Sequence, residues 1–465
     1  MALIKSISGI RGVIGGKQGE SLTPFEVVRY TAAFGSWVMA HQRRGKVVIG
    51  RDARASGEMI NRLVIGTLQG LSIDVIDLGL STTPTVEIAV QEEQASGGIV
   101  ISASHNPGNW NALKLLNSKG EFVSSAEGHE ILSIAEKGNV EFAPVGNLGK
   151  YFQNHTYLQK HVEKILRLAL VDKAAIAAAN FSIVVDGVNS TGGIVVPMLL
   201  EALGVQKIEK LYCEPNGIFP HNPEPLPEHL THLCSKIAQG DYDLGIAVDP
   251  DVDRVAFICE DGTPFGEEYT LVAVADYVLS QNKGGNAVSN LSSTRALQEI
   301  ALKRGGNYFA SAVGEVNVIT AMKAHGAVIG GEGNGGVIYP ELHYGRDALV
   351  GIALFLTHLA KFGKSAKRLR ATYPNYYISK NKIELTDGMN VDEIIAKIRE
   401  RYKKHPINLT DGLKIEFGRE WVHLRKSNTE PILRIYAESE SQVMADSLAR
   451  KIISDIKEFI TSKTF

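Results

Sequence analysis

Residues 98–107 read Gly98-Ile-Val-Ile-Ser-Ala-Ser-His-Asn-Pro107, so that an apolar run passes directly into a polar loop. The same arrangement recurs at Leu244-Gly-Ile-Ala-Val-Asp-Pro-Asp-Val-Asp-Arg254 and at Ala327-Val-Ile-Gly-Gly-Glu-Gly-Asn-Gly-Gly336. A nearly all-apolar run of this length is typical of a strand that is buried on both faces between helices. Because α/β domains place ligands at the loops that leave strand ends, these three loops are candidate binding loops.

Each of these strands closes a longer repeated unit. A first strand ends in a polar turn, a helical stretch follows, and a second apolar strand precedes the strand quoted above. Any three α/β domains would share strand–helix alternation, but the polar loop falls at the same place each time, which favours true repeats. The sequence therefore predicts three related mixed-sheet α/β domains, over residues 1–150, 151–255 and 256–371. The first strands are Lys46–Asp52, Phe181–Gly187 and Asn286–Asn290, and the second strands lie near 71–78, 205–212 and 307–313.

The pattern of strand-like and helix-like segments changes after Tyr373-Pro374. The following segments read as strands of an antiparallel sheet, accompanied by helical segments near 391–403 and 441–460. We therefore expect a fourth domain of the α+β class over residues 372–465. Its expected strands are Lys380–Leu385, Leu413–Gly418, His423–Arg425 and Leu433–Glu438.

Length, charge and cysteine usage limit the class of protein. The chain has 465 residues, which is too long for one hydrophobic core. A net charge of −2 gives no global attraction for nucleic acid or an acidic membrane, so an anion site has to be built locally. The first ten residues do not read as a signal peptide, and the most apolar run, Leu349–Ala360, is too short for a bilayer span. Cys213, Cys234 and Cys259 read as reduced thiols, which predicts a cytoplasmic protein. We expect no nucleic-acid or membrane partner, and a monomer or homodimer.

The second loop alternates three aspartates, Asp249, Asp251 and Asp253. Pro250 favours an extended backbone at Asp249, and residues i, i+2 and i+4 of an extended chain project to one side. Three carboxylates on one face repel one another unless a cation lies there, and oxygen-only ligands favour Mg²⁺ over zinc. A solvated acidic turn is the alternative, whereas an EF-hand loop does not fit because Arg254 occupies the place of its glycine. The loop predicts a magnesium site.

The first loop carries Ser102, Ser104, His105 and Asn106. A serine among small and polar residues at a strand end is approachable, but its hydroxyl needs a base, a metal or a prior modification to act as a nucleophile. Because Asn-Pro is also a common turn dipeptide, this loop alone fits either a turn or a nucleophile.

In the third loop, glycines surround Glu332 and Asn334. Glycine lets a backbone approach a ligand closely or adopt a positive φ. A carboxylate would repel a phosphate group, but it accepts hydrogen bonds from sugar hydroxyls. The third loop therefore fits a sugar better than a phosphate.

A fourth cluster, Arg425-Lys-Ser-Asn-Thr-Glu-Pro431 with Arg434 beyond it, combines guanidinium, ammonium and hydroxyl groups. These groups bind phosphate, and the Ser, Asn and Thr beside the arginine favour an anion site over a surface charge cluster. Near the N-terminus, Arg11 lies between glycines in Ser8–Gly12, which carries little meaning alone.

Taken in order, the four loops resemble those of the α-D-phosphohexomutase family, and the resemblance covers the whole chain. It implies three related α/β domains and a smaller C-terminal α+β domain, like the TATA-box-binding protein, around a central cleft. The stretches Gly331–Pro340 and Asn109–Lys114 look most like those of phosphoglucosamine mutases of an archaeal-like branch.

The resemblance implies roles for individual residues. Ser104 is expected to be phosphorylated in the active enzyme, and the three aspartates to hold Mg²⁺ together with a phosphoryl oxygen of that serine. Lys114 becomes a candidate general acid or base. The remaining implied residues are Arg11, His105 and Arg254 around the reacting phosphoryl group, Glu332 with Asn334 at the sugar, and Arg425, Ser427, Asn428, Thr429 and Arg434 at the non-reacting phosphate.

The resemblance also implies the reaction. The phosphoserine would pass its phosphoryl group to the free hydroxyl of a hexose phosphate, and the resulting hexose 1,6-bisphosphate, which also serves as activator, would return its other phosphate to Ser104. Many bacterial relatives carry Ser and then His after the sugar-loop Glu, but this chain has Asn334 and Gly336 there. The second acid or base is therefore open, with His105 and His343 as alternatives.

The expected substrate is glucosamine 6-phosphate, which would become glucosamine 1-phosphate. Phosphomannomutase or phosphoglucomutase activity is the first alternative, because neutral sugar hydroxyls suit Glu332 as well as an amino group does. A Mg²⁺-dependent sugar phosphatase and a non-catalytic sugar-phosphate sensor are more remote. The intact Ser104, Lys114 and three aspartates disfavour the sensor.

Overall fold

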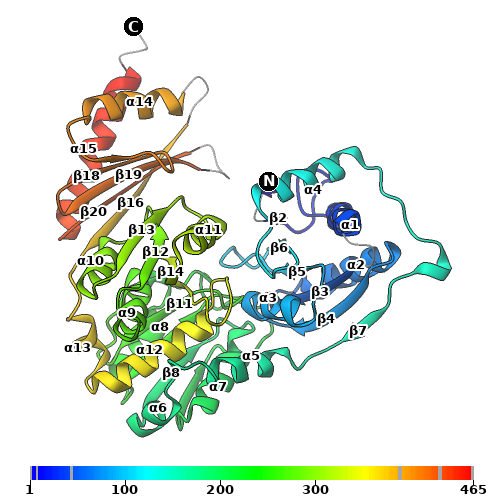
Figure 1. Ribbon diagram of the computed structural model, residues 1–465, viewed down its shortest axis with the longest axis horizontal. Helices are drawn as coiled ribbons and strands as arrows, with labels where there is room; N and C mark the ends of the chain where they lie inside the picture. Colours follow the sequence, from blue (N-terminus) through cyan, green and yellow to red (C-terminus); the bar gives the residue numbers. More distant parts are fainter. Residues whose placement is uncertain (1–2, 7–8, 42–44, 386–389, 428–431, 462–465) are drawn as a thin grey trace. The chain divides into compact units, whose positions relative to one another are not determined.

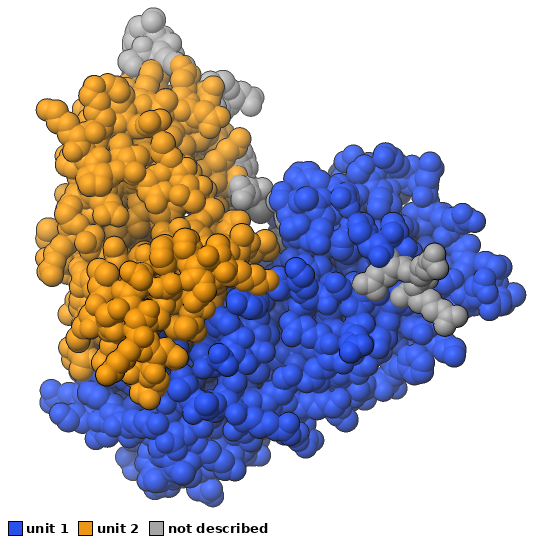
Figure 2. Space-filling view, in the orientation of Figure 1, with its two compact units in different colours: residues 1–278, 335–370 blue, residues 279–334, 371–465 orange. Residues whose placement is uncertain are grey.

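The computed structural model describes residues 3–6, 9–41, 45–385, 390–427 and 432–461 (Figure 1). The chain forms two compact units, which are described separately (Figure 2). Unit 1 comprises residues 1–278 and 335–370, and unit 2 comprises residues 279–334 and 371–465.

The first sheet of unit 1 has seven strands in the order β1-β2-β6-β5-β3-β4-β7. Strands β5, β3, β4 and β7 are parallel, whereas β6, β2 and β1 run antiparallel to their neighbours. Apolar residues of α1, α2 and α4 form one core with this sheet. The strands are β1 (Ile4–Ser6), β2 (Gly9–Val13), β3 (Lys46–Arg51), β4 (Asp74–Leu80), β5 (Gly97–Ile101), β6 (Trp110–Leu116) and β7 (Tyr151–Gln153), and the helices are α1 (Pro24–His41), α2 (Gly57–Gly70), α3 (Thr83–Glu92) and α4 (Ser125–Lys137), with a 3₁₀ turn at Val145–Asn147.

The second sheet of unit 1 has the order β11-β10-β8-β9. Strands β10, β8 and β9 are parallel, and β11 is antiparallel to β10. Its strands are β8 (Ser182–Asp186), β9 (Lys207–Leu211), β10 (Leu244–Val248) and β11 (Val255–Cys259). The other elements of unit 1 are α5 (Tyr157–Leu166), α6 (Lys173–Ala179), α7 (Gly192–Leu203), a 3₁₀ turn at Pro227–His229, α8 (Thr231–Gln239), β15 (Gly336–Ile338), α12 (Ala348–Phe362) and α13 (Ala366–Arg370).

Unit 2 contains three adjacent parallel strands in the order β13-β12-β14, which two helices connect in the chain. These elements are β12 (Asn286–Asn290), α10 (Arg295–Lys303), β13 (Asn307–Ser311), α11 (Glu315–His325) and β14 (Ala327–Glu332). Helix α9 (Glu267–Gln281) carries the chain across the division between the units.

The C-terminal part of unit 2 is an antiparallel sheet in the order β16-β20-β19-β18-β17. Helices α14 and α15 share one hydrophobic core with this sheet. Figure 1 draws the sheet and these two helices in orange to red. The elements are β16 (Tyr377–Glu384), α14 (Val391–Arg401), β17 (Ile407–Asn408), β18 (Leu413–Phe417), β19 (Glu420–Lys426), β20 (Ile432–Ser439) and α15 (Gln442–Thr461).

The predicted fold class is confirmed: the sheets are mixed and accompanied by helices, and the last domain is an antiparallel sheet with two helices. Every residue of β5 and β10 is buried, as expected of strands covered on both faces. Among the described residues, no helix combines the length and apolar character needed to cross a membrane. Cys213, Cys234 and Cys259 are free thiols.

Candidate functional site

Ser104 lies in the turn that follows β5, with a backbone φ of 47°. This left-handed conformation is uncommon for a residue with a Cβ, and surrounding contacts have to hold it. Its Oγ donates a 2.7 Å hydrogen bond to Oδ2 of Asp249 and lies 3.4 Å from Nδ1 of His105. The structure therefore brings the predicted nucleophile to a predicted metal ligand.

The side chain of Arg54 is fully buried and supports the turn that contains Ser104. Its guanidinium donates to the backbone carbonyls of Ser104, Asn106, Pro107 and Trp110, the last three at 2.6, 2.6 and 3.1 Å. Four carbonyls on one side chain fix the path of the turn, which accounts for the strained φ of Ser104.

Asp52 completes this support. Its Oδ2 lies 3.1 Å from Nε of Arg54 and accepts a 2.6 Å hydrogen bond from Oγ of Ser102, which in turn accepts from the backbone N–H of Ser104 at 2.9 Å. Burial raises the pKa of Asp52, and the charge of Arg54 opposes that rise. Sequence reasoning missed Asp52 and Arg54; the available signal was two charged residues directly after an apolar strand.

The three aspartates lie in a turn after β10 rather than on an extended segment. The N–H of Val252 donates to the carbonyl of Asp249 at 3.1 Å, and Val252 has a φ of 62°. The predicted extended geometry is wrong here because the chain must reverse to enter the antiparallel strand β11. The turn nevertheless gathers the three carboxylates, whose ligand atoms all lie within 4.8 Å of one another.

The donor set of this turn fits a hard divalent cation. Asp249, Asp251 and Asp253 are 0% exposed, and Oδ1 of Asp251 and of Asp253 are buried without a hydrogen-bond partner. Burial, followed by the charges of Asp253 and Asp251, raises the pKa of Asp249 well above its ordinary value. Carboxylate oxygens that are buried, crowded and unsatisfied are suited to Mg²⁺.

Two cations hold the second oxygens of these carboxylates. Nζ of Lys114 lies 2.5 Å from Oδ2 of Asp251, and Nη2 of Arg346 lies 2.6 Å from Oδ2 of Asp253. Burial would lower the pKa of Lys114, but the negative charges of Asp251 and Asp253 outweigh burial and raise it. Burial would raise the pKa of Asp253, but Arg346, then Lys114 and Arg254, lower it. Arg346 was not predicted, because no motif marks it.

The remaining predicted residues of unit 1 share this electrostatic environment. Nε of Arg254 lies 3.7 Å from Oδ1 of Asp253. Burial, then Arg254, lowers the pKa of Arg11, and Asp251 opposes that change. Burial, then Arg254 and Arg11, lowers the pKa of His105 to about 2, so this imidazole is neutral and only weakly basic.

His343, the other alternative for the second acid or base, is enclosed between carboxylates. Nδ1 lies 3.3 Å from Oε2 of Glu87 and Nε2 lies 3.3 Å from Oδ2 of Asp347, and the side chain is 1% exposed. This enclosure favours a structural role for His343 over contact with a substrate, and the identity of the second acid or base stays a prediction.

In unit 2, Glu332 ends β14 and is 6% exposed. Its Oε1 accepts hydrogen bonds from Nδ2 of Asn290 at 2.8 Å and from the N–H of Gly314 at 3.2 Å. Asn334 follows in the same turn, where Gly335 has a φ of 85°. The predicted sugar loop is thus fixed through one oxygen of its carboxylate.

The described part of the predicted phosphate loop starts from β19. Arg425 lies opposite Arg434 of β20, and Ser427 is 6% exposed. Nε of Arg425 lies 3.5 Å from Oδ2 of Asp411, which accepts a 3.0 Å hydrogen bond from the N–H of Val313. Because the next N–H, that of Gly314, binds Glu332, adjacent peptide groups link the two loops. Asn428 and Thr429 lie outside the described residues.

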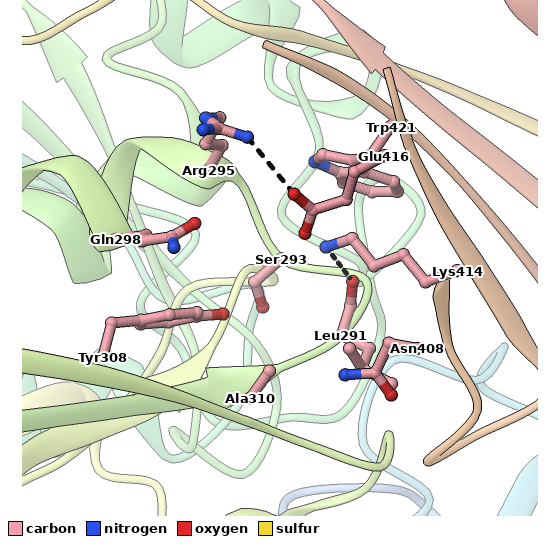
Figure 3. Close-up of a pocket in the computed structure, with 10 residues that line it drawn as sticks. All are labelled: Leu291, Ser293, Arg295, Gln298, Tyr308, Ala310, Asn408, Lys414, Glu416 and Trp421. Carbon is pink, nitrogen blue, oxygen red and sulfur yellow. Dashed lines mark hydrogen bonds and ion pairs between the residues drawn. The ribbon is translucent and has the colours of Figure 1, made fainter. Parts of the chain in front are cut away.

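The C-terminal sheet has one face in a hydrophobic core and the other face beside a cavity. Val422 and Leu424 of β19 enter the core with α14 and α15, and the alternate residues Trp421 and His423 lie on the other face. That face borders a cavity of about 200 Å³, in which Arg295 and Glu416 form an ion pair and Lys414 donates to the carbonyl of Leu291 (Figure 3). The lining residues are Leu291, Ser293, Arg295, Gln298, Tyr308, Ala310, Asn408, Lys414, Glu416 and Trp421.

The arrangement in unit 1 fits phosphoryl transfer. The hydroxyl of Ser104 donates to a carboxylate of the aspartate cluster, and Lys114, Arg254 and Arg346 lie against the other carboxylates of that cluster. Phosphoryl transfer depends mainly on positioning and on charge neutralisation.

Four family models match consecutive parts of the chain. They describe phosphoglucomutase/phosphomannomutase α/β/α domain I at residues 3–141, domain II at 157–262, domain III at 266–376, and the C-terminal domain at 382–454.

Curated relatives match over nearly the full length. The chain is 32% identical to a probable phosphoglucosamine mutase of Methanopyrus kandleri, with 97% of each chain covered. It is 35% identical to a phosphoglucomutase/phosphomannomutase of Thermococcus kodakarensis, with 94% of each covered. It is 30% identical to a phosphoglucosamine/phosphogalactosamine mutase of Sulfurisphaera tokodaii, with 100% of each covered.

A solved structure supports the same relationship. A phosphoglucomutase/phosphomannomutase family protein of Burkholderia thailandensis matches with a TM-score of 0.84 and 26% identity over 98% of each chain.

Proposed function

Since the chain belongs to the phosphoglucomutase/phosphomannomutase family and is an enzyme that transfers phosphate within a hexose phosphate, we propose that Ser104 carries the phosphoryl group and that glucosamine phosphate is the substrate. The reaction interconverts glucosamine 6-phosphate and glucosamine 1-phosphate through a hexose 1,6-bisphosphate. Mg²⁺ is the cofactor, and the bisphosphate is the activator.

The observation that carries this proposal is the 2.7 Å hydrogen bond between Ser104 Oγ and Asp249 Oδ2. It places the hydroxyl beside a cluster of three buried aspartates with unsatisfied oxygens. A hydroxyl beside a metal-binding cluster fits a phosphoserine whose phosphoryl oxygens are neutralised by the cation. When bound, Mg²⁺ would supply that neutralisation.

The transfer balances at each step. In the first transfer the bond between phosphorus and Ser104 Oγ breaks, a bond from phosphorus to the 1-hydroxyl oxygen of the sugar 6-phosphate forms, the 1-hydroxyl proton passes to a base, and Ser104 Oγ takes a proton. In the second transfer the bond between the 6-phosphorus and the sugar 6-oxygen breaks, a bond from that phosphorus to Ser104 Oγ forms, the Ser104 hydroxyl loses its proton, and the sugar 6-oxygen takes a proton. Lys114, whose pKa is raised by Asp251 and Asp253 against the effect of burial, is held protonated and can supply the proton that the sugar 6-oxygen takes.

The residues of unit 2 bind the rest of the substrate in this proposal. Glu332 and Asn334 take the sugar hydroxyls or the amino group, and Oε1 of Glu332 is already fixed by Asn290 and Gly314. The non-reacting phosphate is held by Arg425, Ser427, Asn428, Thr429 and Arg434.

The choice of glucosamine rests on the relatives that carry that name, including those of Methanopyrus kandleri and Pyrococcus horikoshii at 32% identity. A second candidate function is phosphoglucomutase/phosphomannomutase activity. The relative of Thermococcus kodakarensis that carries this name is 35% identical, which favours it. The domain boundaries near residues 150, 255 and 371, the cytoplasmic location and a monomeric or homodimeric state stay predictions.

Phosphorus NMR tests the proposal. Purified protein is incubated with Mg²⁺, a trace of hexose 1,6-bisphosphate and, separately, the 6-phosphates of glucosamine, glucose and mannose. We expect a 1-phosphate signal, fastest with glucosamine 6-phosphate and absent in Ser104→Ala. Faster conversion of glucose or mannose 6-phosphate would favour the second function. Released inorganic phosphate would indicate a phosphatase, and unchanged spectra a sensor; either would refute the mutase.

A further inference from the structure

The aspartate turn of unit 1 is held by the N-termini of two helices. At the start of α3, the N–H of Thr83 donates to the carbonyl of Asp251 at 2.9 Å, and its Oγ1 donates to Oδ2 of the same residue. At the start of α12, the N–H of Ala348 donates to the carbonyl of Val252 at 3.2 Å. Helix N-termini offer free N–H groups and a positive dipole end, so both favour this acidic turn.

A buried ion cluster joins the two helices to each other. His343 lies between Glu87 of α3 and Asp347, the N-cap of α12, at 3.3 Å from each carboxylate. Oδ2 of Asp347 also lies 2.9 Å from Nε2 of His161 on α5. All four side chains are 0–1% exposed.

This cluster is a structural junction. Among the described residues, the group with metal-ligand geometry is the aspartate triad, and the cluster is not part of it. Buried ion clusters contribute little net stability because desolvation offsets their attraction, and their best-attested use is to select one arrangement. Gly345 permits the close packing, since a Cβ there would lie 1.9 Å from Oε2 of Glu87.

Arg346 connects the cluster to the triad. It lies between Gly345 and Asp347, is 8% exposed, and holds Oδ2 of Asp253 at 2.6 Å. The other oxygen, Oδ1 of Asp253, is buried without a hydrogen-bond partner. One oxygen is therefore fixed by the guanidinium of Arg346, and the other, which lies 3.7 Å from Nε of Arg254, is the one that would bind a cation.

We propose that Arg346 and His343 are positioning residues for the metal-binding turn: Arg346 sets the rotamer of Asp253, and His343 fixes the segment that carries Arg346 against α3. This inference rests on the proposed function, because it takes Asp253 as a metal ligand. Residues that orient metal ligands change metal affinity by about 10- to 100-fold when they are replaced.

Direct metal binding distinguishes positioning from simple charge. Arg346 is a cation near the metal, so if it acted only by Coulomb repulsion, Arg346→Gln would bind a divalent ion more tightly than wild type. A positioning role predicts the opposite. We expect Arg346→Gln to weaken Mn²⁺ binding at least 10-fold, Arg346→Lys to weaken it less, and His343→Gln to weaken it several-fold.

The measurement is titration of each full-length variant with Mn²⁺, read from the electron paramagnetic resonance signal of the free ion. Arg167→Gln, an arginine with a side chain 79% exposed, is the matched control, and circular dichroism verifies folding. At saturating Mg²⁺, the KM for the hexose phosphate should stay near that of wild type. A folded Arg346→Gln that binds Mn²⁺ as wild type does, or more tightly, would overturn the inference alone. Failure of wild type to bind Mn²⁺ would overturn the proposed metal site as well.

Discussion

Ser104 Oγ and Asp249 Oδ2 are joined by a 2.7 Å hydrogen bond although the residues are 145 positions apart in the chain. Ser104 lies in the turn after β5, and Asp249 directly follows β10. The two strands belong to different sheets. Both residues lie in unit 1, so this contact belongs to the internal structure of one compact body.

Asp249→Asn should remove most of the activity while leaving the fold intact. The amide keeps the size of the side chain but removes the negative charge that accepts from Ser104 and contributes to the triad. Loss of one electrostatic partner at a reacting group lowers kcat by about 10²- to 10³-fold. Steady-state kinetics at saturating Mg²⁺ measure the change, and labelling of Ser104 by bisphosphate reports the first transfer. Asp241→Asn on the surface is the control; an Asp249→Asn enzyme with half the wild-type kcat would contradict the site.

Arg54→Met should destabilise the protein and misplace the phosphorylated serine. The substitution keeps the length of the side chain but leaves Asp52 as an unpaired buried charge and frees four loop carbonyls. Breaking a buried pair costs about 3–5 kcal/mol. Urea unfolding measures the loss, and Asp52→Asn in the same chain should recover part of it, since the two residues are coupled. The exposed Arg62→Met serves as control; equal stability of the two variants would show that Arg54 does not support the turn.

The pH dependence of stability should reveal the charge of His343. Burial opposes protonation, but the interactions with the carboxylates of Asp347 and Glu87 outweigh it and raise the pKa of His343 to about 9. Because this value is above the ordinary 6.5, the contribution is complete below about pH 6.5 and is lost as pH rises through about 9. A shift of this size corresponds to as much as about 3 kcal/mol.

Unfolding free energies of wild type and His343→Gln, measured from pH 6 to pH 9.5, test this directly. Subtracting the two unfolding free energies removes the contributions of titrating groups common to both proteins. The remaining difference should be largest at pH 6 and should shrink towards pH 9.5. A difference that stays constant across this range would mean that His343 is neutral in the folded protein.

Sequence patterns predicted the strands well because burial on both faces leaves an unmistakable apolar run. Strands β5, β10 and β14 and the polar loops after them all lie where the sequence placed them. The turn at Asp249–Asp253 was misjudged as extended, since Pro250 restricts only its predecessor, and the antiparallel partner β11 dictates the reversal.

The supporting charges could not be predicted in the same way. Arg54 and Arg346 act on loops 50 and 93 positions away, at Ser104 and Asp253, and a single sequence does not show which distant residues pack together. His343 was a candidate acid or base because this chain has Gly336 where many bacterial relatives carry a histidine, although a lone histidine is more often structural than catalytic. Only the packing of Glu87 and Asp347 around it shows a structural role.

Glu332→Gln should separate the amino sugar from the neutral sugars. Oε1 of Glu332 accepts from Asn290 and Gly314, and a glutamine Oε1 can accept the same hydrogen bonds, so stability should change by less than about 0.5 kcal/mol. The second oxygen becomes an N–H₂ group, which cannot accept from a sugar hydroxyl or pair with an ammonium group. We expect kcat/KM to fall at least 100-fold for every substrate, because polar partners are left unmatched. An ammonium group forms an ion pair with the carboxylate, whereas a hydroxyl forms a hydrogen bond to it with only one charged partner. If the second charge adds about 1.4 kcal/mol, glucosamine 6-phosphate should lose about 10-fold more than glucose 6-phosphate. Glu400→Gln, with a side chain 72% exposed, is the control for the substitution itself. An equal loss for both sugars would mean that Glu332 contacts hydroxyl groups and not an amino group, which would favour the phosphoglucomutase/phosphomannomutase activity. An unchanged kcat/KM would mean that Glu332 is not part of the substrate site.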